Sequence, residues 1–423
     1  MQTRRRTTWA VLFAALFACS SKSPAPGTVE DSGIPAANSD AQPRADVIDG
    51  PGELTVPSDT GPSKSDVSSN VRSDVGGKDT SSTDLPSLPV LCPASAAGDT
   101  PLGTDSPPAH WKITDAITFL NVGGTGSYDR VVNMAPGTWP PPCSEATACV
   151  KASKPISGPL VPFDEEMTMV FSGPIELYDI AVYAPNGTGF ARVSYWNRCS
   201  SDNLVFMNNL GGGSVSGVWT VCGGNSQSYA SADGSQAAPA PTQFAGTLAD
   251  GIGVNVMSAS LCQGTGDTSE CGFYRDVGLH GFRGAADGTK IFAVKLRMPV
   301  GSVTPAYWIL PAQVVRTAQY GCNCRGMGGA GGCGELDVAE VLSSDDAMAA
   351  TSTIYSFKSV RNGNGSTFQR PTLASVTFVV IFDGAAGTIS LRRLDANAFD
   401  FGATIASTVV AAWQANQGVT SSM

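Results

Sequence analysis

Histidine is almost absent from this sequence of 423 residues, in which His110 and His280 are the only two. No serine stands in a Gly-x-Ser-x-Gly elbow, so the sequence does not indicate a hydrolase of the Ser-His-Asp type. Two glycine runs, 211–213 and 328–332, lack the strand–loop–helix context that phosphate-binding loops need. These absences argue against two common classes of enzyme. We interpret His280 as a structural residue or as one at the edge of a cleft.

Positive charge is also in short supply, since 26 Lys and Arg residues stand against 36 Asp and Glu residues, for a net charge of −10. Proteins that bind nucleic acid or anionic membranes concentrate positive charge on one surface. The composition therefore argues against nucleic acid as a partner and against a basic membrane-binding face. It does not select among neutral substrates such as polysaccharides.

Aromatic residues are missing from a long stretch near the N-terminus, since no Phe, Tyr or Trp occurs between Phe17 and Trp111. Residues 20–90 are rich in Ser, Pro, Gly, Asp, Thr and Lys. Such a segment cannot bury enough apolar surface to offset the entropy that is lost on ordering. We predict that residues 20–90 form a disordered linker, which would tether a folded domain to a membrane.

The first 19 residues have the pattern of a targeting segment. Arg4, Arg5 and Arg6 form a basic region, and the apolar run over residues 9–17 is too short to span a bilayer. Residues 16–19, Leu-Phe-Ala-Cys, resemble a bacterial lipobox, in which the peptide is cut before the cysteine and Cys19 carries the lipid. An ordinary signal peptide is the alternative. We expect a location in the cell envelope, as an outer-membrane lipoprotein or at the cell surface, with membrane contact through the lipid only.

Long amphipathic helical patterns are missing from the rest of the chain, which contains many short alternating runs instead. Examples are residues 166–171, 175–183, 291–298 and 376–382. This pattern, with abundant Gly, Ser and Thr, favours an all-β sandwich. We predict a glycine-rich N-terminal unit over residues 91–160, packed on a main β-sandwich domain over residues 161–423. Residues 403–416 could form a helix or a last strand.

Cysteine usage agrees with export. Of the 11 cysteines, ten remain when the lipidated Cys19 is set aside, and an even number is typical of disulfide-bonded secreted chains. Close spacing predicts local bridges for three pairs: Cys143/Cys149, Cys199/Cys222 and Cys262/Cys271. Cys322, Cys324 and Cys333 could instead bind metal, but no histidine lies near them in the sequence, so disulfides are favoured. Which of these three pairs with Cys92 stays open.

Three carboxylates lie within the β-prone segment Gly331–Leu342, at Glu335, Asp337 and Glu340. Acidic residues are unfavourable in strands and costly to bury unpaired. On a helix, residues five apart point about 140° away from each other, and on a regular strand Glu340 would face away from the other two. One β-bulge between Asp337 and Glu340 restores a common face and turns Leu336 and an apolar pair toward the core. The alternative is a chance cluster of solvated acids on an edge strand.

Two carboxyls that face one groove are the minimum requirement for glycoside hydrolysis. On a flat strand Glu335 and Glu340 would be roughly 13 Å apart at Cα, at about 3.3 Å per residue. Retaining enzymes hold their two carboxyls about 5–5.5 Å apart. The side chains must therefore lean together on a concave sheet.

The segment Glu335–Glu340, Glu-Leu-Asp-Val-Ala-Glu, resembles the Glu-x-Asp-x-x-Glu signature of glycoside hydrolase family 16. Residues 305–311, Pro-Ala-Tyr-Trp-Ile-Leu-Pro, look like the strand that precedes this signature. A closer resemblance is to the fungal cell-wall family described as probable circularly permuted 1,3-β-glucanases, through residues 316–324 and 332–337.

The similarity to that fungal family extends over about residues 117–384. Residues 175–183 look like the terminal strand of family 16, but they precede the catalytic strand here, as a circular permutation implies. Residues 379–384 resemble a late strand of family 16, and nothing like the terminal strand follows them. Family 16 enzymes often carry a histidine on the strand after the acidic motif, and residues 351–358 contain none.

The resemblance implies a concanavalin-like β-jelly-roll sandwich and a retaining mechanism without a cofactor. Glu335 would then be the nucleophile and Glu340 the general acid and later the base. Asp337 would hold Glu335 in place and separate the charge states of the two. Trp308 and Tyr320 are candidates for stacking against sugar rings, with packing in the core as the alternative for each.

These expectations combine into one functional prediction, a secreted, lipid-anchored, retaining endo-1,3-β-glucanase that acts on β-glucan as a monomer. A non-catalytic β-glucan-binding or surface-scaffold protein on the same fold is an alternative from another class. A glucan transglycosylase is a nearer alternative, because water and sugar can compete for the same intermediate.

Overall fold

The computed structural model describes residues 112–134, 149–211, 226–262, 271, 278–301, 304–317, 324–325, 332–342 and 347–423. The chain divides into two units, 1–83 and 84–423, and all described residues belong to the second. The predictions for the targeting segment with Cys19, the linker and Tyr320 concern residues outside the described part of the chain.

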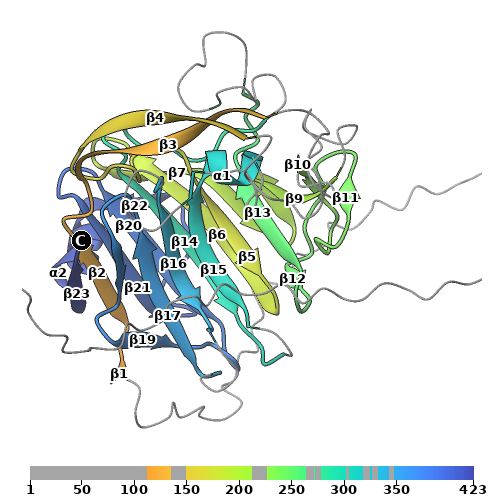
Figure 1. Ribbon diagram of the computed structural model, residues 1–423. Coiled ribbons are helices and arrows are strands. Elements are labelled where there is room, and N and C mark those ends of the chain that lie inside the picture. The colour runs from red at the N-terminus through yellow and green to blue at the C-terminus, as the bar shows by residue number, and fades with distance from the viewer. Residues whose placement is uncertain are drawn as a thin grey trace, which may run out of the picture. The chain divides into compact units, whose positions relative to one another are not determined.

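Two stacked β-sheets build the domain, as the sequence predicted (Figure 1). The larger sheet runs, among the described residues, in this order: β1 (Lys112–Ile113), β19 (Ser366–Gln369), β17 (Ala349–Tyr355), β16 (Glu335–Glu340), β15 (Ala306–Pro311), β5 (Met167–Ser172), β13 (Gly253–Met257), β9 (Val205–Gly211), β10 (Ser226–Ala230) and β11 (Ala237–Ala238). β18 (Val360–Asn362) pairs with β17 off this path. β16 therefore lies in the interior of its sheet.

The second sheet has this order in the described part: β22 (Thr404–Ala406), β7 (Gly189–Asn197), β6 (Ile175–Pro185), β14 (Lys290–Arg297), β20 (Val376–Asp383), β21 (Thr388–Asp395), β2 (Ala116–Leu120) and β23 (Val419–Ser422). β12 (Thr247–Leu248) pairs with β6, and β8 (Ser200–Asp202) pairs with β7. The segment 403–416, which the sequence left open, contains both β22 and the helix α2 (Ser407–Ala415).

The main core lies between the two sheets, where alternating apolar side chains from both inner faces meet. Phe171 and Tyr307 stack there with ring centroids 5.0 Å apart. β14 and β20 are apolar on both faces, because Phe292 and Phe378 join this core while Ile291 and Val379 pack on the other side, in the cluster that includes residues of α2. Burial on both faces explains why these two strands read as nearly continuous apolar runs.

The strands near the two ends of the described chain are neighbours. β2 pairs in parallel with β23, from Ile117 opposite Val419 to Leu120 opposite Ser422. A chain whose ends meet in one sheet can be opened elsewhere without loss of its strand pairing. The topology therefore fits the circular permutation that the sequence suggested.

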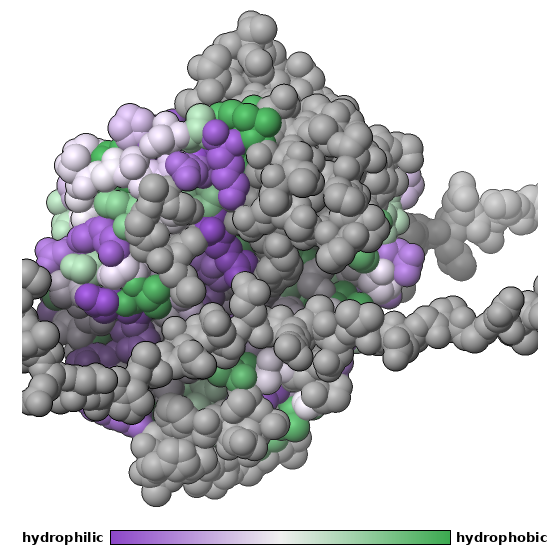
Figure 2. All heavy atoms as spheres, viewed as in Figure 1, coloured by the Kyte–Doolittle hydropathy of each residue, from purple (hydrophilic) through white to green (hydrophobic). Residues whose placement is uncertain are grey.

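A two-stranded ribbon, β3 (Gly124–Met134) with β4 (Cys149–Gly158), crosses one end of the sandwich above α1 (Ala312–Thr317) (Figure 1). Glu165 joins these elements, since its carboxylate accepts hydrogen bonds from Tyr128 at 2.8 Å and Gln313 at 3.0 Å and pairs with Lys154 at 2.6 Å. Figure 2 shows hydrophilic side chains gathered near α1 on the face seen in Figure 1.

The described helices, α1 and α2, contain six and nine residues. Neither combines the length and the apolar character that a membrane-crossing helix requires.

Candidate active site

The acidic segment forms the bulged strand that its spacing predicted. On β17, Asp337 pairs with Thr353 and Glu340 with Thr351, so one extra residue lies between the two acids. The pairing with β15 shifts at the same place. Leu336, Val338 and Ala339 belong to the core between the sheets, which leaves the three carboxylates on the opposite face of β16.

The alternative of solvated acids on an edge strand is wrong. β16 is paired on both sides, with β15 and β17. Glu335 is 8% exposed and Asp337 is 4% exposed. Charged carboxylates are costly to bury, so the structure must compensate them or hold some of them protonated.

The pKa of each of the three carboxyls is raised, and burial is the main cause. The effect is strongest for Asp337, whose pKa rises well above its usual range because the charges of Glu335 and Glu340 add to its burial. A group in this position is the first of the three to take a proton. The carboxyl of Asp337 also hydrogen-bonds both glutamates, which lowers the pKa of each.

Arg325 supplies a positive charge to this cluster. Its Nε lies 2.5 Å from Oε2 of Glu335, and its charge lowers the pKa of all three carboxyls. Arg325 directly follows Cys324, which is disulfide-bonded to Cys333, two residues before Glu335. Sequence reasoning missed Arg325, although a cation beside a cysteine and upstream of the acidic motif is a signal that it could have used.

Two aromatic residues lie beside the carboxylates. Trp308 on β15 is directly opposite Asp337, but it is only 7% exposed and packs in an apolar cluster with α1 residues. Tyr355 on β17 is opposite Glu335. Burial and the three negative charges raise the pKa of Tyr355, so its hydroxyl stays protonated. The binding role predicted for Trp308 stays a prediction.

Hydroxyl groups occupy the neighbouring strand β17, whose sequence contains no histidine. Thr351, Thr353 and Tyr355 of β17 pair with Glu340, Asp337 and Glu335 in turn and share their face. All three β17 side chains are half-buried. They could donate hydrogen bonds to a carboxylate or to a sugar, but they cannot act as a base near neutral pH.

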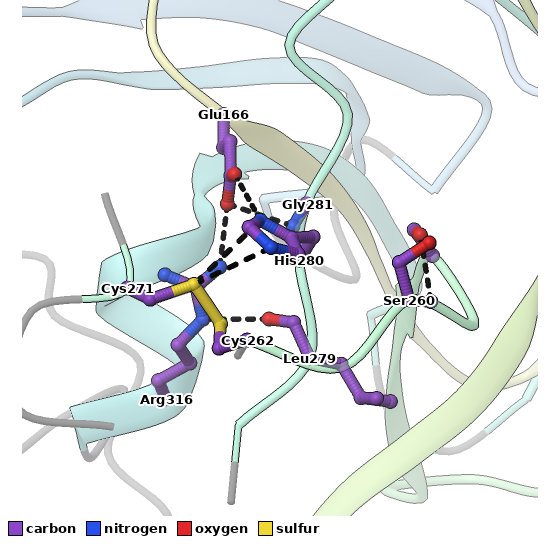
Figure 3. The surroundings of a disulfide bond; sticks show 9 residues. Glu166, Ser260, Cys262, Cys271, Leu279, His280, Gly281 and Arg316 are labelled. Carbon is purple, nitrogen blue, oxygen red and sulfur yellow. Dashed lines mark hydrogen bonds and ion pairs between the residues drawn. A yellow bond between two sulfur atoms is a disulfide. The ribbon is translucent and has the colours of Figure 1, made fainter. Parts of the chain in front are cut away.

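A second buried carboxylate, Glu166, lies near α1 (Figure 3). His280 places Nδ1 2.5 Å from Oε1 of Glu166, and Oε2 accepts from the Gly281 amide at 3.0 Å and from Nη2 of Arg316 at 2.5 Å. These contacts outweigh burial and lower the pKa of Glu166 to about 2. They agree with the interpretation of His280 as structural.

The disulfides described in the structure answer part of the cysteine prediction. Cys262 and Cys271 form a disulfide, as their spacing predicted. Cys324 and Cys333 form another, a pairing that the sequence had left open. Cys199 is also disulfide-bonded; its predicted partner lies outside the described residues. Cys262, Cys271 and His280 are close enough together to hold a metal ion. With the two sulfurs bonded to each other, however, neither is a thiolate ligand.

Comparison with known proteins gives matches to one family over most of the described chain. The C-terminal part of cell wall protein YJL171C/Tos1 matches residues 188–413, and the N-terminal part matches residues 115–185. No solved structure matches the chain significantly.

Three curated relatives have the same kind of name. The probable circularly permuted 1,3-beta-glucanase TOS1 of Saccharomyces cerevisiae is 26% identical over 72% of this chain and 91% of its own length. The Candida albicans protein of the same name is 38% identical over 54% of this chain and 50% of its own length. Probable circularly permuted 1,3-beta-glucanase PGA52 of Candida albicans is 29% identical over 72% of this chain and 83% of its own length.

Proposed function

This chain belongs to the YJL171C/Tos1 family of cell wall proteins, and from that premise we propose that it is a cell-surface, retaining endo-1,3-β-glucanase. One observation carries the proposal. Two buried carboxylates and a half-buried one share one face of an interior strand, and the middle one hydrogen-bonds the other two. Folding alone gains nothing from such a cluster, because its burial raises the pKa of every member.

The first chemical step gives different roles to the two glutamates, although burial raises the pKa of both. Glu335, paired with Arg325, is the anion that attacks the anomeric carbon and forms an ester with the sugar. Glu340, whose pKa is raised by burial, gives its proton to the glycosidic oxygen as the bond to the leaving sugar breaks. Asp337 keeps its proton and holds both glutamates by hydrogen bonds.

The second step returns the enzyme to its first state. Glu340, now a carboxylate, takes a proton from a water molecule whose oxygen attacks the anomeric carbon. The ester bond to Glu335 breaks, and the sugar leaves with the same configuration that it had at the start. The proton balance closes within these two carboxyls. Trp308 and Tyr320 are the aromatic residues that we propose contact the glucan.

The low exposure of Glu335 and Asp337, together with the packing of Trp308, favours a second candidate, a non-catalytic β-glucan-binding or scaffold protein. Incubation of the purified protein with laminarin, with products resolved by length, decides between them. Short oligosaccharides throughout the size range support an endo-glucanase, and longer products than the starting chains support a transglycosylase. Binding without any change in chain length would replace the enzyme with the scaffold.

We also propose that Cys19 anchors the protein to a membrane through a lipid. Cys19→Ser should move the protein from the membrane fraction into the soluble or unprocessed pool. An unchanged membrane fraction would show that the lipobox interpretation is wrong.

A further inference from the structure

Arg325 approaches the carboxylates from a rigid anchor. Cys324 and Cys333 are joined by a disulfide and also by a hydrogen bond from the amide of Cys333 to the carbonyl of Cys324 at 2.8 Å. Both cysteines are buried, at 2% and 0% exposed. The residue that carries the cation is thus fixed directly beside the residues that lead into β16.

The chain on both sides of Cys333, just before Glu335, is equally constrained. A Cβ at Gly332 would lie 2.7 Å from the backbone nitrogen of Phe357, which is closer than side chains tolerate. Gly334 has φ +102, a conformation that other residues rarely adopt. Both partners of the Arg325–Glu335 ion pair therefore sit in a defined frame.

The titratable and charged groups that face Glu335 come from three places in the described part of the chain. Asp337 and Glu340 lie on its own strand, Tyr355 lies opposite on β17, and Arg325 lies beside the disulfide. On the other side, β15 presents Trp308 to this face. Among these groups Arg325 is the cation; it forms an ion pair with Glu335, and its charge also acts on Asp337 and Glu340.

We infer that Arg325 is a positioning residue, which fixes the negative charge of the cluster on Glu335 and leaves the proton on Glu340. This inference rests on the proposed function. In the first step the ion pair opposes the effect of burial on Glu335 and favours its ionised form. When the ester forms, Glu335 loses its charge, and Arg325 then acts on Glu340 without a competing anion. Glu340, which has given its proton to the leaving oxygen, is thereby held as the carboxylate that the water step needs.

The test is the pH dependence of laminarin hydrolysis by Arg325→Gln and Arg325→Lys. Loss of the cation raises the pKa of both glutamates, and more so that of Glu335, which Arg325 contacts directly; the acidic limb of the bell-shaped profile should therefore move to higher pH by about one unit and the basic limb by less. The kcat of Arg325→Gln should fall about 10-fold or more, with a smaller change in KM. Arg325→Lys keeps the charge and should restore much of the profile. Arg361→Gln removes an exposed arginine that bonds the Ser422 carbonyl and should leave the profile unchanged.

The outcomes separate this inference from the proposed function. A shifted profile in Arg325→Gln, with recovery in Arg325→Lys, supports the positioning role, since a purely structural defect would lower activity without moving the limbs. An unshifted profile in Arg325→Gln overturns the inference while hydrolysis itself stands. If Arg325→Gln does not fold, Arg325→Lys still decides, because a shift as large as about one unit in this variant contradicts a role of charge. Failure of the proposed function would instead appear as undiminished activity in Glu335→Ala.

Discussion

Glu166 and Glu335 are each 8% exposed, and each lies beside a disulfide whose cysteines are nine residues apart. Their pKa values nevertheless move in opposite directions. Glu166 is bound by Arg316, His280 and a backbone amide, and its pKa falls to about 2. Burial raises the pKa of Glu335 and the charge of Glu340 adds to the rise, which Arg325 and a hydrogen bond with Asp337 offset only in part.

The difference fits a structural role for Glu166 and the catalytic role that we propose for Glu335. A buried charge that is fully hydrogen-bonded stabilises one arrangement of the elements around it. In the case of Glu166, these elements are α1, β5 and the segment that contains His280. A buried cluster with more acid than cation lowers stability, and proteins keep such clusters at sites of function. Burial alone does not distinguish the two carboxylates, whereas the charges and hydrogen bonds around each of them do.

The largest expected effect comes from removing the two glutamates of the cluster. Glu335→Ala and Glu340→Ala should each lower laminarin hydrolysis roughly 10³-fold, since each removes one half of the acid–nucleophile pair. Glu340→Ala should keep much more activity on an activated aryl glycoside, whose leaving group does not need a proton. Glu166→Gln serves as the control, because the comparison predicts that it changes activity little if the protein folds.

Azide gives this prediction a second measurement. Azide should rescue Glu340→Ala with a β-azide product, and Glu335→Ala with an α-azide product, because each variant opens a different face of the sugar. Products of the same configuration from both variants would contradict the assigned roles. Laminarin hydrolysis at the wild-type rate in both variants would contradict a catalytic role for Glu335 and Glu340.

Removing Glu166 should instead lower stability. Glu166→Gln breaks the pairs with Arg316 and His280 and leaves buried charge uncompensated, so the free energy of unfolding should fall by about 3–5 kcal/mol. Glu176→Gln, which breaks the half-exposed pair with Arg297 at 2.5 Å, should cost about 1 kcal/mol or less. Denaturant unfolding at pH 7 measures both variants, and equal losses would contradict the structural role of Glu166.

The pH dependence of stability follows from the same carboxylate. The pKa of Glu166 is depressed from about 4.5 to about 2, so its contribution is present above pH 4.5 and is lost as the pH falls toward 2. Glu166→Gln should therefore flatten the decline of stability over this acidic range. A decline as steep as in the wild-type protein would assign the acid sensitivity to other groups.

Replacing each pair of disulfide-bonded cysteines by serine tests whether the surroundings of Glu166 and of Glu335 differ in function. Closing a loop of this size is worth about 3 kcal/mol, so Cys262→Ser/Cys271→Ser and Cys324→Ser/Cys333→Ser should lose similar amounts of stability. Only the second pair holds Arg325, and only its loss should move the pH profile of hydrolysis. Profiles that move equally in both double variants would mean that the disulfides act through general stability.

The sequence predicted the bulged strand of the candidate active site because its evidence is local. The spacing of Glu335, Asp337 and Glu340 fits one face only with a bulge, and the bulge is there. Alternating apolar runs predicted the sandwich for the same reason. Close spacing likewise predicted the bridge between Cys262 and Cys271.

The partners of the carboxylates could not be predicted, because they come from distant parts of the chain. Glu166 meets His280 and Arg316, which lie 114 and 150 residues away in sequence. Arg325 is closer to Glu335, but its contact depends on a disulfide that the sequence left open among three cysteines. The charge balance that distinguishes the two centres thus exists only in the folded chain.

The smallest expected effect is a gain of stability in Asp337→Asn, opposite in sign to the loss expected for Glu166→Gln. Burial, together with the charges of Glu335 and Glu340, raises the pKa of Asp337, so this group favours the folded state at low pH and disfavours it as the pH rises. Asp337→Asn keeps the size and a hydrogen-bond donor but removes the titrating group. It should raise the free energy of unfolding at pH 7 by about 1 kcal/mol, a size typical of stabilising changes at strained functional sites, while hydrolysis falls. The gain should shrink at pH 3, where the carboxyl is protonated in both states. A loss of stability at pH 7, like that of Glu166→Gln, would show that the two centres are held in the same way.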